Sequence, residues 1–166
     1  MHKRILVLID GSPASKRSLD EAIDIARTTR GLLRLVHVVD DLSLARRSTD
    51  TDTWLGTLHN WGREILEAAK KAAEARGVHA DVMLYSDFAT PLADAVAYEA
   101  RMWPADLIVL STPGRCGRWA MGSDAERFLR TSTVPVMLVP EPVEETVDKR
   151  SSTRQQTALA PALAFE

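Results

Sequence analysis

Five short aliphatic runs alternate along this chain with segments whose apolar residues have helical spacing. The runs lie at Lys3–Asp10, Leu32–Val39, Val78–Ser86, Asp106–Ser111 and Val134–Val139. Strands that alternate with helices are joined by crossover connections, which make the strands parallel and place helices on both faces of the sheet. The sequence therefore predicts a doubly wound α/β fold with a five-stranded parallel sheet and four helices.

The first helix has the clearest predicted boundaries. Ser12 is suited to the N-cap and Pro13 to the first helical position, whereas Gly31 is expected to end the helix. Inside these bounds apolar residues recur every three or four positions, which indicates one buried face. The other helices are expected to run from the end of a polar stretch at 40–52 to Gly77, from Pro91 to Met102, and from Ser123 to Arg130.

Length and composition limit the classes of function. The 166 residues fit a single domain, and a formal net charge of −2 gives no field that would favour nucleic acid or anionic lipid as the main partner. One cysteine, no apolar run of about 20 residues and no apolar leader at the start predict a cytoplasmic protein that does not enter a membrane. The domain is expected to cover residues 1–140, with a polar, disordered tail over 141–166.

A glycine-rich turn after the fourth aliphatic run is the main candidate for a binding site. Asp106–Ser111 leads into Gly114 and Gly117, and Gly122 with Ser123 opens the last predicted helix. A strand, a glycine turn and a helix start can surround phosphate with backbone N–H groups. The glycine patterns of P-loop and dinucleotide-binding proteins are both absent. A receiver domain would need a lysine after the fifth strand, where this chain has proline and glutamate.

Several of these motifs together resemble the universal stress protein family. They are the first strand with its Asp10-Gly-Ser-Pro turn, His37 in the second strand, the Asp106 strand, and Gly122-Ser123 followed by a strand with Pro135. The resemblance covers Lys3 to about Pro140. It implies the adenine nucleotide alpha hydrolase-like version of the α/β fold, a homodimer, and in one branch of the family a glycine motif that binds ATP.

Position by position, the resemblance implies a nucleotide site. Asp10 matches the acidic residue near the ribose and adenine, and Leu8 and Val38 match positions that contact the base, Val38 through its backbone. The positions that match the phosphate and ribose wrap are Leu110, Ser111, Gly114, Gly122, Ser123 and Asp124.

The glycine turn departs from the family pattern in two ways. Ser111 replaces the first glycine, and the stretch between Gly114 and Gly122 is two residues shorter than in the motif. Gly117 can relieve the strain of a shorter loop by adopting a positive φ, and Arg115 adds a guanidinium group suited to phosphate.

The preferred hypothesis is a stress-response module that binds ATP or a related adenine nucleotide, with magnesium entering alongside the phosphates, and that regulates unknown protein partners. It is expected to form a homodimer through the last strand, Val134–Val139, whose exposed edge would otherwise invite aggregation. We assign no catalytic residue and no structural metal, so any ATP hydrolysis should be slow. Two alternatives remain: a dimeric module of the same fold that no longer binds nucleotide, and a weak nucleotide hydrolase or adenylyl-transferring enzyme.

Simpler roles are also open for individual residues. Asp10 can act only as a turn residue after a strand, and Ser123 with Glu126 has the spacing of a capping box. His37, which lies between valines, is expected to be a hydrogen-bonded histidine of the interior and not a metal ligand.

Overall fold

Five strands form one parallel sheet in the order β3-β2-β1-β4-β5 in the computed structural model, which describes residues 1–39, 51–86, 90–112, 128–130 and 132–140. The strands are β1 (Arg4–Leu8), β2 (Leu32–Val38), β3 (Ala80–Tyr85), β4 (Leu107–Thr112) and β5 (Val136–Pro140). This confirms the predicted parallel sheet. Most strands are shorter than the predicted runs because residues at the ends of the runs, both polar (Asp10) and apolar (Val39 and Val134), belong to the connections.

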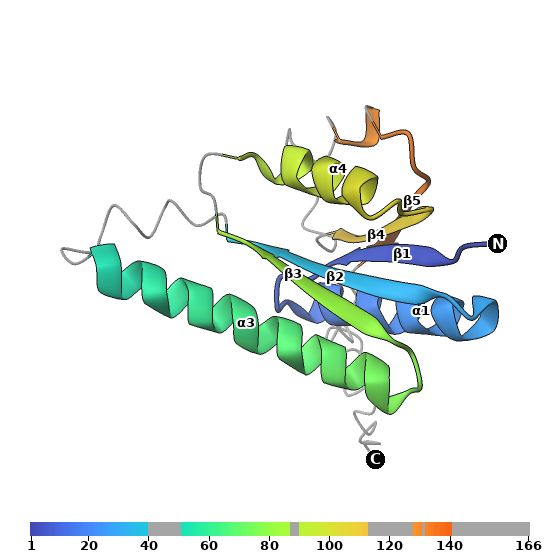
Figure 1. The fold of residues 1–166 in the computed structure, drawn as a ribbon, viewed down its shortest axis with the longest axis horizontal. Coiled ribbons are helices and arrows are strands. Elements are labelled where there is room, and N and C mark those ends of the chain that lie inside the picture. The colour runs from blue at the N-terminus through green and yellow to red at the C-terminus, as the bar shows by residue number, and fades with distance from the viewer. Residues whose placement is uncertain (40–50, 87–89, 113–127, 131, 141–166) are drawn as a thin grey trace, which may run out of the picture.

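Helices cover both faces of the sheet, as predicted. The helix α4 (Leu92–Met102) lies on one face, and α1 (Pro13–Thr29) and α3 (Thr51–Ala75) lie on the other (Figure 1). Of the last predicted helix only residues 128–130 are described, and these are helical. In the described ranges no helix combines the length and the apolar character needed to cross a bilayer.

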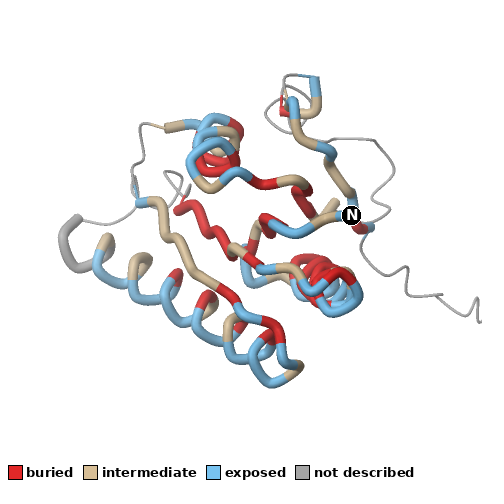
Figure 2. The backbone as a smooth tube through the Cα atoms, turned by 45° about the vertical axis from the view of Figure 1, so that its right-hand side comes forward, coloured by how far each residue is buried: buried red, intermediate tan, exposed pale blue. Residues whose placement is uncertain are grey.

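The core has two layers because alternate strand residues point to opposite faces. Ile5 and Val7 of β1 pack toward α1 and α3, whereas Leu6 between them packs toward α4, and all three are fully buried. In Figure 2 the buried positions accordingly follow the strands and the sheet-facing sides of the helices. Burial of each such side chain is worth about 1.5–3 kcal/mol. Two buried faces explain why the strands read as continuous apolar runs.

The helix α1 begins as predicted and ends one residue earlier than expected. Ser12 has extended backbone angles, and its side chain accepts the Ser15 N–H at 3.1 Å, so it is the N-cap that precedes Pro13. The left-handed residue at the other end is Arg30, with φ 53°, and not Gly31. Gly31 is favoured for a different reason: a Cβ on it would lie 3.0 Å from the carbonyl oxygen of Lys3, a tighter contact than most side chains make.

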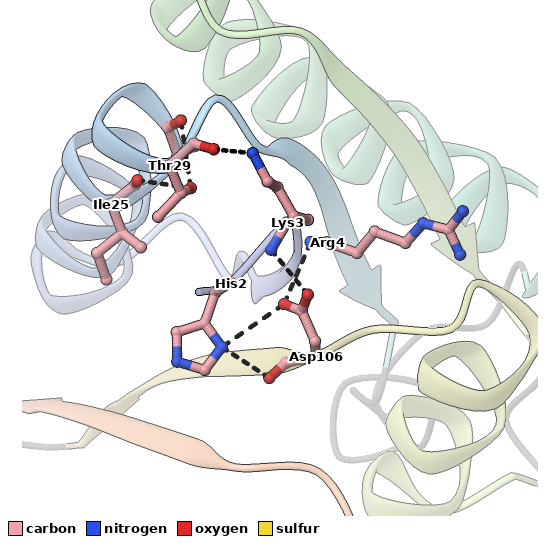
Figure 3. A network of polar contacts seen from close by, with 7 residues as sticks. His2, Lys3, Arg4, Ile25, Thr29 and Asp106 are labelled. Carbon is pink, nitrogen blue, oxygen red and sulfur yellow. Dashed lines mark hydrogen bonds and ion pairs between the residues drawn. The ribbon is translucent and has the colours of Figure 1, made fainter.

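A polar network fixes the amino end of β1 against β4 (Figure 3). The Asp106 carboxylate accepts the backbone N–H groups of Lys3 at 2.7 Å and of Arg4 at 3.2 Å, and His2 Nδ1 lies 2.9 Å from the Asp106 carbonyl oxygen. The Lys3 ammonium donates to the carbonyl of Thr29 at the end of α1. These contacts set the β1–β4 register, which determines the residues that meet at the opposite edge.

Candidate functional site: the carboxyl edge between β1 and β4

The strand order places the change in winding direction between β1 and β4. From β1 the chain moves outward to β2 and β3, then crosses back to β4 on the other side of β1 and continues to β5. In open parallel sheets, ligands bind beyond the carboxyl ends of the strands at this point. The carboxyl ends of β1 and β4, at Leu8 and Thr112, therefore define where a ligand site is expected.

Three of the predicted site residues form an apolar floor at this edge. Leu8, Val38 and Leu110 belong to one hydrophobic cluster, on the face of the sheet that α4 covers. Val38 and Leu110 are buried and Leu8 is half-buried. Ser111 follows Leu110, is half-buried and pairs in register with Val139 of β5. The structure thus brings four of the predicted residues to one edge from three strands.

Asp10 stands just past the end of β1, exposed and held in a tight turn. Its Oδ1 accepts the Ser12 N–H at 2.8 Å, and its own N–H donates to Ser15 Oγ at 3.4 Å. Gly11 between them has φ +80°, a conformation that other residues rarely adopt. Partial burial would raise the pKa of Asp10, but the hydrogen bonds from Ser12 and Ser15 outweigh it and hold the pKa below its ordinary value. The side chain is therefore a carboxylate at neutral pH.

Asp10 is thus a turn residue, as the simpler interpretation proposed. This role is compatible with ligand binding. An ionised carboxylate offers about four lone-pair positions, of which the Ser12 N–H uses one, and the side chains of Ser12 and Ser15 also act on the group. The turn orients the group, and the remaining acceptor capacity suits donors such as the hydroxyls of a sugar.

The helix α3 supports this turn from behind, a relationship that sequence reasoning missed. A Cβ on Gly11 would lie 3.3 Å from Cζ2 of Trp61, whose side chain is 47% exposed. The Trp61 ring meets the His37 ring edge-on with centroids 5.5 Å apart, and His37 Nδ1 lies 2.7 Å from the Ile9 carbonyl oxygen. His37 is therefore a hydrogen-bonded interior residue, as expected. In the local sequence, only the glycine at position 11 points to this contact, because it leaves room for the Trp61 ring.

The phosphate-binding half of the predicted site falls outside the described residues. This applies to Gly114, Arg115, Gly117, Gly122, Ser123 and Asp124. The described residues fit the nucleoside half of a nucleotide, because an apolar floor suits a flat base and a fixed carboxylate suits ribose hydroxyls. In the described part of the chain, no three metal-ligating side chains of histidine, cysteine, aspartate or glutamate lie together.

Comparison with known proteins identifies the family. The model of the universal stress protein family matches residues 1–140. The chain belongs to the universal stress protein family. A family member from Methanocaldococcus jannaschii is 31% identical over 149 residues, which cover 87% of this chain and 86% of the relative.

Solved universal stress proteins share the fold. A crystal structure from Burkholderia pseudomallei is 30% identical, covers 83% of this chain and 96% of its own, and has a TM-score of 0.68. An Archaeoglobus fulgidus protein in complex with dAMP is 21% identical, with coverage of 82% and 97% and a TM-score of 0.61. Other solved structures with this fold contain cAMP or AMP.

Proposed function

We propose that this universal stress protein binds ATP or a related adenine nucleotide at the carboxyl edge between β1 and β4. The observation that carries the proposal is the placement of Asp10. Its ionised carboxylate is fixed beside the point where the winding reverses, at the edge that Leu8, Val38 and Leu110 reach. A group that accepts hydrogen bonds, next to an apolar floor, matches the two chemically different parts of a nucleoside.

The ligands of solved relatives support an adenine nucleotide as the class. The complexes with dAMP, cAMP and AMP share an adenine base and one phosphate. In this chain the glycines Gly114 and Gly122 with Ser123 would hold the phosphates, Arg115 and Gly117 would assist, and Asp124 would complete the wrap. Magnesium would enter with the phosphate oxygens of ATP.

The proposed role is regulation through a homodimer and not turnover. The strand β5 lies at one edge of the sheet, and Leu138 on it is 38% exposed. Pairing of two β5 strands across a two-fold axis would cover the open β5 edge of each protomer and bury this leucine. A ligand at the end of the neighbouring strand β4 can then alter the surface that the dimer offers to cytoplasmic partner proteins.

Equilibrium dialysis tests the binding claim directly. Wild-type protein and the Gly122→Glu variant are dialysed against labelled ATP at sub-millimolar concentration, with magnesium present. We expect retention by the wild type and a loss in the variant, because a glutamate would bring both bulk and negative charge to the phosphate site. Equal retention by both proteins, or none by the wild type, would contradict the proposal.

A second candidate function is a dimeric interaction module that binds no nucleotide. It is favoured by the engagement of Asp10 in its own turn, together with the replacement at Ser111. Thermal melting separates the two candidates, because a ligand that binds only the native state raises the Tm with its concentration. If ATP, ADP and AMP at millimolar concentration all leave the Tm unchanged, the interaction module is the better account.

A further inference from the structure

A second cavity lies at the amino edge of the sheet, opposite the proposed nucleotide site. It has a volume of about 410 Å³ and is formed where α1 and α3 end and the chain turns into β2 and β3. In Figure 1 this edge is on the right, on the same side as the N-terminus. Two tight turns shape the cavity, with positive φ at Arg30 and Gly77.

Every ionisable side chain that lines this cavity is basic. They are Arg27, Arg30, Arg76 and His79. The guanidinium of Arg76 is bound by Asp24 at 2.5 Å and Asp20 at 3.0 Å, two carboxylates that are not part of the lining. Within the described residues, Arg27 and Arg30 form no ion pair with any carboxylate.

From these observations we propose that the cavity binds a small anion with two linked phosphoryl groups. The two guanidinium groups of Arg27 and Arg30 present planar forks of N–H donors, which match phosphoryl oxygens in pairs. A cavity of this volume holds a diphosphate with room to spare. The proposal is independent of the nucleotide site, since the two lie at opposite edges of the sheet.

The partial negative charge at the carboxyl ends of α1 and α3 is too small to cancel the charge of the arginines that line the cavity. The carboxyl end of each helix carries about half a negative charge, so α1 and α3 together contribute roughly one. Arg27 and Arg30 carry two positive charges, which exceed that of the helix ends. Arg76 with its two aspartates adds one net negative charge, and His79 lies 3.5 Å from Asp81. These charges nearly balance, so the directed N–H donors of Arg27 and Arg30, and not a net positive field, would have to hold the anion.

The backbone amides of the two turns provide no alternative anion site. The N–H groups of Gly31 and Leu32 donate to the carbonyls of Ala26 and Lys3, both at 2.8 Å. Those of Gly77 and Val78 donate to carbonyls within the last turns of α3, at 2.9 and 3.0 Å. An anion in the cavity must therefore be held by side chains, which makes the arginines the residues to test.

Isothermal titration of inorganic pyrophosphate into the full-length protein tests the proposal. Wild type is compared with Arg27→Gln/Arg30→Gln and with Arg63→Gln/Lys71→Gln, a control that removes the same charge from exposed positions of α3. We expect saturable binding by wild type, at least about tenfold weaker binding by the first variant, and less than a twofold change in the control. Circular dichroism confirms that each variant is folded.

Two further titrations extend the test. Asp24→Asn releases Arg76 from one of its two carboxylates and is expected to tighten pyrophosphate binding, an effect that does not depend on the arginine variant folding. ADP titrated into an Asp10→Ala background shows whether a nucleoside diphosphate also enters the cavity. The proposal is overturned if wild type gives no saturable binding at millimolar pyrophosphate, if both double variants bind equally well, or if Asp24→Asn weakens binding.

Discussion

Arg34 of β2 and Glu99 of α4 form a buried ion pair, with 2.6 Å between Nη1 and Oε1. Glu99 is only 2% exposed, and its other oxygen accepts the Tyr85 hydroxyl at 2.5 Å. The Arg34 guanidinium also lies 5.0 Å from the ring centroid of Trp103 and 3.4 Å from an oxygen of Asp81. This network attaches α4 to the β2–β3 side of the sheet and so holds the helix over the apolar floor of the candidate site.

Glu99→Ala is predicted to destabilise the protein by about 3 kcal/mol, because it leaves Arg34 largely buried without its principal partner. The matched control is Glu74→Ala, which removes a glutamate from an exposed pair with Lys70, 3.9 Å apart on α3. That change should cost less than about 0.5 kcal/mol. Urea unfolding of the two variants measures the difference, and equal losses would show that the buried pair has no special weight.

Tyr85→Phe is predicted to change how stability depends on alkaline pH. Burial and the hydrogen bond to Glu99 raise the pKa of Tyr85 above its ordinary value, so the folded state favours the neutral phenol. The resulting stabilisation is complete below about pH 10 and is lost as the pH rises further, where the unfolded tyrosine ionises. Phenylalanine removes this decline and costs about 1–3 kcal/mol at neutral pH, since Glu99 loses a donor. Urea unfolding between pH 7 and 11 should show the flatter profile; an unchanged slope would contradict this account.

The sequence predicted the strands and helices well because their signals are local. Ser12 and Pro13 mark the start of α1, and continuous apolar runs mark strands that are buried on both faces. The network around Arg34 could not be predicted, because the partners of a charged residue inside an apolar run lie on other elements. The same holds for Trp61, whose contact with the Asp10–Ser12 turn exists only after α3 has packed against the sheet. Matching to the family motif singled out four site residues, Leu8, Asp10, Val38 and Leu110. The register of the strands explains why these residues lie at one edge of the sheet.

Gly62→Ala is predicted to destabilise the protein, although alanine favours helices. A Cβ on Gly62 would lie 2.8 Å from Cδ2 of His37 and 2.9 Å from Cδ1 of Leu84, so both side chains would have to move, and the His37 ring is held by its hydrogen bond to Ile9. Overpacking of this kind costs about 1–3 kcal/mol. At Gly56, in the same helix, a Cβ would have no atom within 4 Å, so Gly56→Ala should stabilise by about 0.5–1 kcal/mol. Thermal melting of the pair gives opposite signs if the packing is as described; a gain at Gly62 would refute it.

Leu138→Lys is predicted to dissociate the proposed homodimer without unfolding the protomer. The side chain is partly exposed on the edge strand β5, where lysine is tolerated in a monomer but would place like charges across a two-fold axis. Leu32→Lys is the control, since Leu32 is an exposed leucine of β2, away from that edge. Sedimentation velocity at micromolar concentration should give a dimer for wild type and for Leu32→Lys, and a monomer for Leu138→Lys. A monomeric wild type would rule out the dimer proposal.

The most direct measurement of the central claim is a calorimetric titration of ATP into wild type, Asp10→Asn and Glu21→Gln at neutral pH. Asparagine can still accept the Ser12 N–H, so the turn is kept while the charge is lost, and Glu21 is an exposed acidic residue on α1. The account predicts saturable binding by wild type and Glu21→Gln, and binding at least about tenfold weaker for Asp10→Asn. Equal affinity for all three proteins, or no binding by wild type at millimolar ATP, would contradict it.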